Sequence, residues 1–148
     1  MIYTALTMQA MKLAYEAHHG QVDKAGVPYI HHPLHLAEQM PDEMSTCVAL
    51  LHDVVEDTSV TIEELERLFP AEVTQAVALM THADGVDYFD YVRAIASNPI
   101  ARRVKLADLA HNSDASRLGD GALAERVQKR LEKYQRAREI LMESEEQP

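Results

Sequence analysis

Hydrophobic positions recur at intervals of three and four residues along most of the chain, the spacing expected of amphipathic helices. In residues 4–19, for example, Met8, Met11, Tyr15 and His18 fall on one stripe. No segment alternates convincingly between polar and apolar residues with a period of two, so the pattern predicts no strand. We therefore expect an all-α fold, a bundle of about seven to eight helices.

Helix-starting and helix-breaking residues divide this pattern into segments. Residues 20–33 are expected to be irregular, because two Gly and two Pro interrupt them. Thr61 begins a capping box with Glu64, and Pro99 suits the first turn of a helix. The predicted helices cover residues 4–19, 34–40, 41–57, 61–69, 70–83, 87–97, 98–116 and 122–143.

Composition excludes several classes of protein. A length of 148 residues fits one domain with a useful core, and a net charge of −10 argues against a general nucleic-acid binder. No run of about 18 apolar residues is present, so no membrane span is predicted. The N-terminal segment has no basic leader before a long apolar stretch, and Cys47 is the single cysteine. Together these features favour a reduced, cytoplasmic setting.

The apolar run CVALL is followed, without a turn residue, by the strongly ionisable stretch HDVVEDT, residues 52–58. Its titratable side chains are His52, Asp53, Glu56 and Asp57. If the helix continues, His52 shares a face with Glu56 and Asp53 with Asp57. Carboxylates this close would repel one another near a core, and a divalent cation would remove that conflict. The alternative is a solvated, acidic helix end.

Two other segments could supply further ligands. His31 and His32 lie in PYIHHP, which we expect to be a loop that Pro residues hold rigid. Asp108 lies within the apolar segment VKLADLAHN, where a carboxylate is costly unless it is paired or bound to a metal. Lys105 and His111, each three residues from Asp108, are the alternative partners and would make an ordinary salt bridge.

The stretches AHHGQVDKAGVPYIHHP, ALLHDVVEDT and VKLADLAHN occur in this order within residues 17–112. They resemble the three sequence blocks of RelA/SpoT-type alarmone hydrolases, a branch of the HD-domain superfamily of metal-dependent phosphohydrolases. The small single-domain alarmone hydrolases are the nearest in size. The resemblance implies a single HD-domain helical bundle over residues 1–148, without room for the synthetase and regulatory domains of the long members. It also implies hydrolysis of guanosine 3′,5′-bis(diphosphate) at the 3′ position.

Carried over position by position, the resemblance implies a role for ten residues. The implied metal ligands are His32, which is the member of the His pair that matches the family, His52, Asp53 and Asp108. The implied residues acting on the attacking water are Glu56 and Asp57. The implied substrate contacts are Lys24, Asn112, Arg130 and Tyr134. A mixed nitrogen and oxygen site suits Mn²⁺ first, and also accommodates Fe²⁺, Co²⁺, Ni²⁺ or Zn²⁺. The implied partner is a small phosphorylated nucleotide.

Three positions depart from the family pattern. Asp23 stands where the family has an Arg that packs on the guanine base, Leu109 where it has the Arg of ADR, and Asp114 where it has the Arg of HNMR. Cations near the substrate pocket are thereby replaced, whereas the metal-binding and water-activating residues are complete.

Four functions therefore remain open from the sequence. They are an alarmone hydrolase, an HD-type phosphohydrolase of another phosphorylated nucleotide or cofactor, a nucleotide-binding HD module without turnover, and a helical interaction domain. Asp23 favours the second. The intact Glu56–Asp57 pair speaks against the third, and Asp108 in an apolar segment speaks against the fourth.

Overall fold

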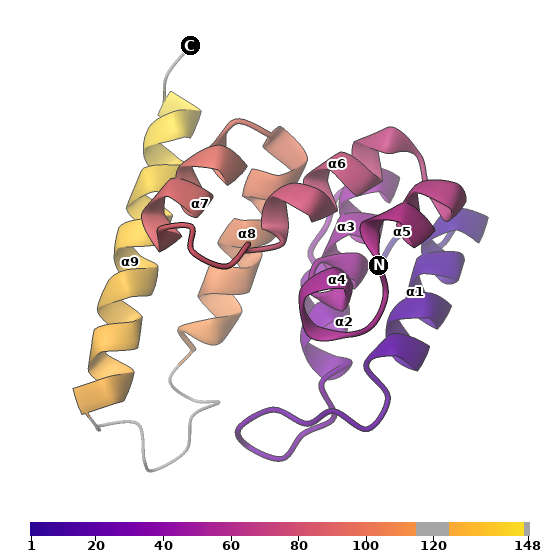
Figure 1. The fold of residues 1–148 in the computed structure, drawn as a ribbon, viewed down its shortest axis with the longest axis horizontal. Helices are drawn as coiled ribbons and strands as arrows, with labels where there is room; N and C mark the ends of the chain where they lie inside the picture. The colour runs from indigo at the N-terminus through magenta and orange to yellow at the C-terminus, as the bar shows by residue number, and fades with distance from the viewer. Residues whose placement is uncertain (115–124, 147–148) are drawn as a thin grey trace.

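The computed structural model describes residues 1–114 and 125–146, and these residues form a bundle of helices (Figure 1). The helices are α1 (Ala5–Ala17), α2 (His31–Glu38), α3 (Glu43–Leu51), α4 (Val54–Asp57), α5 (Ile62–Leu68), α6 (Ala71–Met80), α7 (Tyr88–Ala96), α8 (Pro99–Asn112) and α9 (Glu125–Glu146). Among the described residues, β pairing is limited to an isolated bridge between Val22 and Pro28. The predicted all-α class is therefore confirmed.

Polar side chains fix where several helices begin. The Asp42 carboxylate accepts a hydrogen bond from the backbone N–H of Ser45 at 2.8 Å, and this starts α3. The Thr61 hydroxyl oxygen accepts from the N–H of Glu64 at 3.2 Å, which starts α5 at the predicted place. Asn98 caps α8, whose first residue is a proline, as the sequence indicates. Local chemistry thus sets the register of these helices.

Two predicted boundaries were wrong. The segment containing His31 and His32 is not a loop, because α2 begins at His31 and Pro33 takes its first turn, where a missing N–H costs nothing. The predicted helix 41–57 is two helices, α3 and α4, separated at His52 and Asp53. Residues 115–116 and 122–124 of the predicted helices, including Leu123, lie outside the described residues.

The break between α3 and α4 has a local cause. The Nδ1–H of His52 donates to the carbonyl oxygen of Ala49 at 2.7 Å. In a continuous α-helix that carbonyl would accept the N–H of the residue four positions later, which is Asp53. Asp53 instead adopts φ −108° and ψ 0°, and the chain turns before α4 begins. The ionisable stretch therefore lies at a corner rather than along one helix face.

α3 is the centre of the bundle, and every residue from Ser45 to Leu51 is buried. It packs against α1, α2, α6 and α8, while α9 packs against α7 and α8. In Figure 1, α1 and α9 accordingly lie at opposite sides of the molecule. The largest fully buried apolar side chains are Leu36, Leu50, Leu51, Leu65, Ile95, Leu109 and Leu141. Within the described ranges, no helix combines the length and apolar character needed to cross a membrane.

Candidate active site

The fold brings three distant segments together at the C-terminal end of α3. His32 comes from the first turn of α2, His52 and Asp53 from the break after α3, and Asp108 from α8. His32 Nε2 lies 2.9 Å from Asp108 Oδ1, and His52 Nε2 lies 3.6 Å from the same oxygen. His32, His52 and Asp108 are only 4%, 1% and 5% exposed. We call these four residues the His/Asp cluster.

His52 presents its Nε2 to this cluster. Because its Nδ1–H is used by the Ala49 carbonyl, Nε2 of the neutral ring carries a lone pair. Nε2 is buried, makes no hydrogen bond to any described residue, and lies 2.9 Å from Asp53 Oδ2. Two electron-rich atoms at that distance repel one another unless a proton or a metal cation lies between them. Burial opposes a charge on His52, yet the carboxylates of Asp53 and Asp108 raise its pKa well above the ordinary value.

The donor set therefore fits a divalent metal ion. Ligand atoms of His32, His52 and Asp53 all lie within 4.8 Å of one another, and Asp108 Oδ1 contacts both imidazoles. Imidazole nitrogens combined with carboxylate oxygens suit first-row divalent metals. Such an ion would also remove the repulsion between His52 Nε2 and Asp53 Oδ2.

His32 is held by contacts on both ring nitrogens. Its Nε2 faces Asp108, and its Nδ1 lies 2.7 Å from Nδ1 of His111, whose ring stacks on it with a centroid separation of 5.0 Å. The neighbouring His31 is exposed. Among the described residues, the histidines that pair with the cluster carboxylates are His32 and His52 and not His31. The helix start therefore turns His32, and not His31, towards the interior.

Asp108 has both kinds of partner that the sequence allowed. Lys105 Nζ lies 2.9 Å from Asp108 Oδ2, which is the ordinary salt bridge, while Oδ1 faces the two cluster histidines. Burial opposes ionisation of Asp108, but Lys105, His32 and His52 hold the pKa of its carboxyl well below the ordinary value. The other expected partner, His111, contacts His32 instead. The salt bridge and the cluster thus coexist, one on each oxygen.

Glu56 and Asp57 lie beside the cluster on α4. Carboxylate oxygens of Asp53, Glu56 and Asp57 lie within 4.8 Å of one another, so the helix break does not separate them. Glu56 Oε1 accepts a hydrogen bond from the backbone N–H of His82 at 2.7 Å, which ties it to the segment after α6. Desolvation and the neighbouring carboxylates of Asp53 and Glu56 raise the pKa of Asp57 to about 6.

A cavity of about 450 Å³ opens against the cluster. Its lining includes all four residues predicted to contact substrate, which are Lys24, Asn112, Arg130 and Tyr134, and also His32. Asn112 has a second contact, because its Nδ2 donates to Asp108 Oδ1 at 3.0 Å. A ligand in this cavity would therefore touch the His/Asp cluster and side chains from α8, α9 and the loop before α2.

The three departures from the family pattern have different surroundings. Asp23 lines the cavity, but its Oδ1 also accepts the N–H groups of Ala25 at 2.8 Å and Val27 at 3.0 Å, so it shapes the loop 22–28. Leu109 is 2% exposed and belongs to the hydrophobic core. Asp114 is exposed just after α8. Of the three departures, Asp23 is therefore the one that places a negative charge on the described lining of the cavity.

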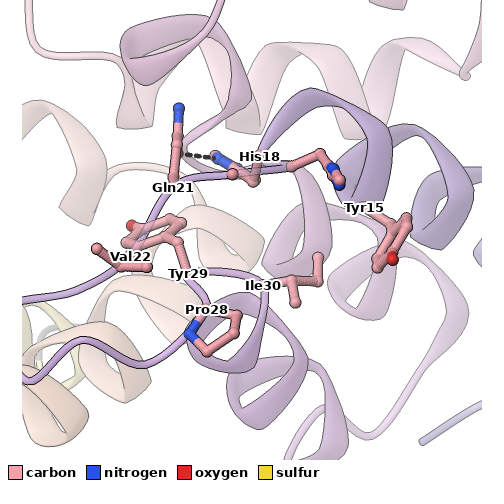
Figure 2. A pocket seen from close by; sticks show the side chains of 9 residues that line it. Tyr15, His18, Gln21, Val22, Pro28, Tyr29 and Ile30 are labelled. Carbon is pink, nitrogen blue, oxygen red and sulfur yellow. Dashed lines mark hydrogen bonds between the residues drawn. The ribbon is translucent and has the colours of Figure 1, made fainter.

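Sequence reasoning missed several residues around the site. The Tyr29 O–H donates to Asp53 Oδ2, and Figure 2 shows Tyr29 with His18 and Gln21 at a second, smaller cavity of about 230 Å³. Burial and the Asp53 carboxylate raise the pKa of Tyr29, so its oxygen keeps its proton. The available signal was a large aromatic residue between a proline and the histidine pair in PYIHHP, which helical periodicity does not evaluate.

Comparisons with known proteins agree with this architecture. A family model described as HD domain matches residues 10–136. MESH1 of Danio rerio, a guanosine-3′,5′-bis(diphosphate) 3′-pyrophosphohydrolase, is 35% identical over 144 residues, which cover 87% of this chain and 80% of MESH1. The bifunctional (p)ppGpp synthase/hydrolase SpoT of Escherichia coli is 36% identical over 121 residues, which cover 70% of this chain but 17% of SpoT. The chain thus spans less than a fifth of the long relative.

A solved structure supports the fold. It is described as a metazoan ortholog of SpoT that hydrolyses ppGpp, and it matches with a TM-score of 0.75 and 24% identity, covering 95% of this chain and 88% of the other. The family model, the coverage of MESH1 and the shared fold lead to one conclusion. This chain belongs to the HD domain family, in the branch that contains MESH1 and SpoT.

Proposed function

We propose that this chain is a metal-dependent phosphohydrolase that removes pyrophosphate from the 3′ position of guanosine 3′,5′-bis(diphosphate). One observation carries the proposal: His32 belongs to the His/Asp cluster and also lines the cavity that holds Lys24, Asn112, Arg130 and Tyr134. A phosphate bound by these polar groups would lie next to the cluster. MESH1, which shares 35% identity over most of both chains, carries this activity in its name.

His32, His52, Asp53 and Asp108 are the proposed ligands of a divalent ion, Mn²⁺ first and Fe²⁺, Co²⁺, Ni²⁺ or Zn²⁺ as alternatives. When bound, such an ion polarises a phosphoryl oxygen and lowers the pKa of water. The surrounding contacts prepare the chain for it. The Ala49 carbonyl takes the Nδ1–H of His52, which leaves Nε2 as the nitrogen that can bind the ion, and Lys105 keeps Asp108 ionised.

Glu56 and Asp57 are proposed to orient the attacking water and to take its proton. The water oxygen adds to the phosphorus bonded to O3′, the bond between that phosphorus and O3′ breaks, and O3′ takes up a proton. The products are GDP and pyrophosphate. The N–H of His82 holds one oxygen of Glu56, which fixes the direction of the other. Lys24 and Arg130 neutralise phosphate charge, and Tyr134 covers the cavity.

A second candidate is hydrolysis of a different phosphorylated nucleotide or cofactor. The observation that favours it is Asp23, which places a carboxylate on the cavity lining where the family has an arginine. A carboxylate cannot stack on a base as a guanidinium can, and it repels a polyanion. The proposed location is the cytoplasm, in line with the buried, reduced thiol of Cys47.

The test is a screen of phosphorylated nucleotides in the presence of Mn²⁺, with inorganic phosphate and pyrophosphate measured separately. Release of pyrophosphate from guanosine 3′,5′-bis(diphosphate) alone supports the first function. Release of inorganic phosphate from nucleoside monophosphates supports the second. Absence of both products, from protein shown to bind Mn²⁺, contradicts hydrolysis altogether.

A further inference from the structure

Tyr29 reaches Asp53 from a segment that lies 24 positions earlier in the chain. Its hydroxyl donates a hydrogen bond to Asp53 Oδ2, the oxygen that also faces His52 Nε2. Asp53 itself sits at the corner between α3 and α4, with φ −108° and ψ 0°. Rotation of a carboxylate about its last torsion is soft, so a bond to one oxygen determines where the other oxygen points.

The Tyr29 ring has a fixed place between two imidazoles. Its centroid lies 4.9 Å from that of His18 and 5.7 Å from that of His32, which is a cluster residue. Two backbone bonds fix the residue as well. The N–H of Tyr29 donates to the carbonyl of Gln21 at 2.8 Å, and its own carbonyl accepts the N–H of His32 at 2.9 Å. Tyr29 is therefore positioned by the same turn that starts α2.

A second connection joins this segment to α4. Gln21 Nε2 donates to the carbonyl oxygen of Asp57 at 3.0 Å, which fixes the amide so that Oε1 is an acceptor. His18 Nδ1 must then donate to Gln21 Oε1, at 2.8 Å, and Figure 2 shows this bond at the edge of the smaller cavity. The end of α1 is thus tied to the helix that carries Glu56 and Asp57.

From these contacts we infer that Tyr29 is a positioning residue, whose hydroxyl holds the Asp53 carboxylate in the orientation that binds the divalent ion of the proposed function. Tyr29 need not touch the ion or the substrate for this role. Hydrogen bonds to metal ligands of this kind typically change metal affinity by about 10–100-fold when they are removed. The His18–Gln21 pair supports the same segment from the other side of the tyrosine ring.

The experiment compares Tyr29→Phe with Tyr15→Phe by titrating the metal-free protein with Mn²⁺ and measuring free Mn²⁺ by electron paramagnetic resonance. Tyr15 is a matched control, because it lines the neighbouring cavity and is 57% exposed. We expect Tyr29→Phe to weaken Mn²⁺ binding by about 10–100-fold and Tyr15→Phe to leave it within about twofold. Asp53→Asn should weaken Mn²⁺ binding more than Tyr29→Phe does. This would show that the Mn²⁺ being measured binds at the His/Asp cluster.

The unfolding temperature of the metal-free protein separates this role from a structural one. If Tyr29 only supports the fold, Tyr29→Phe lowers the unfolding temperature of the metal-free protein and leaves Mn²⁺ affinity of the folded protein unchanged, and the inference is overturned. The inference is also overturned if Asp53→Asn leaves Mn²⁺ affinity unchanged. The wild-type hydrolysis assay is independent of both: a protein that binds Mn²⁺ through Tyr29 and Asp53 but cleaves no nucleotide would contradict the proposed function alone.

Discussion

The His/Asp cluster and the cavity beside it are built in different ways. Cluster residues are nearly all buried, and each is held by further contacts, such as Lys105 of the same helix on Asp108 and His111 of α8 on His32 of α2. The predicted substrate contacts are more exposed, and Lys24 lies on the loop before α2. A change in the cluster disturbs the core of the bundle, whereas a change at the cavity does not. The proposed metal-binding residues therefore depend on the packing of the bundle. The residues predicted to contact substrate depend on it much less.

The strongest test of this contrast is Asp53→Ala. It removes a proposed metal ligand and leaves His52 Nε2 without the facing carboxylate. We expect Mn²⁺ affinity to fall by more than about 100-fold, beyond the range seen for residues that only support a ligand. Hydrolysis should fall to background. Asp84→Ala is the control, since Asp84 is exposed between α6 and α7, and both quantities should stay at the wild-type level.

Glu56→Gln separates water activation from metal binding. The glutamine can still accept the N–H of His82 through its amide oxygen, so the local structure should persist. Loss of the proposed base should lower kcat on the order of 10²–10⁴-fold, with Mn²⁺ affinity within a few-fold of wild type. Steady-state kinetics beside a metal titration measure both. Full activity of Glu56→Gln, compared with the exposed-site control Glu66→Gln, would exclude Glu56 as the base.

Lys105→Met tests how strongly the cluster depends on its buried surroundings. Lys105 is 12% exposed and is the cationic partner of Asp108 Oδ2. Loss of this cationic partner of a buried carboxylate should lower the free energy of unfolding of the metal-free protein by about 3–5 kcal/mol. Urea denaturation measures this loss, and saturating Mn²⁺ should reduce it because the ion also neutralises Asp108. The exposed Lys12→Met is the control, and an equal small change in both variants would contradict the assignment.

The fold was predictable where local rules act alone. Periodic apolar positions indicate helices, and caps such as Thr61 and Asn98 mark their starts. The corner after Leu51 was not predictable in this way, because it depends on the His52 side chain taking the carbonyl of Ala49. Periodicity contains no information about that competition. The early start of α2 was missed because Pro33 was interpreted as a loop residue, although proline is also favourable in a first helical turn.

The sequence indicated which residues to examine for the candidate site, but not which of them contact one another. Ionisable residues in apolar segments, such as His52 and Asp108, are detectable because they are costly without a partner. Which partner each one takes depends on tertiary contacts. Neither the bond from Tyr29 to Asp53 nor the stacking of His111 on His32 follows from sequence spacing. Asp23 likewise looked like a simple loss of a cation, whereas it also holds a loop together.

Asp42→Ala changes α3 at the end far from His52, and should affect stability without affecting chemistry. Loss of the cap should cost about 1 kcal/mol at neutral pH. Hydrogen bonds from Ser45 lower the pKa of Asp42 below its ordinary value of 3.8, so its contribution is present above that pH and is lost as pH falls through the lower folded-state value. Urea denaturation at pH 7 and pH 3 should show the difference between wild type and variant shrinking. A lower kcat of Asp42→Ala at neutral pH would contradict the expectation that this cap contributes to stability and not to hydrolysis.

Asp23→Asn should have the smallest effect, and it acts on the cavity alone. Asparagine keeps the oxygen that accepts the N–H groups of Ala25 and Val27, so the loop should stay in place while one negative charge is removed. If a polyphosphate binds in the cavity, KM should fall by about threefold at low salt, because one partly exposed charge contributes less than about 1 kcal/mol. The gain should disappear at high salt, where such charges are screened, and kcat should not change. Asp84→Asn removes a charge outside the cavity lining and should leave KM as it is, so equal effects in the two variants would show that Asp23 does not face the phosphates.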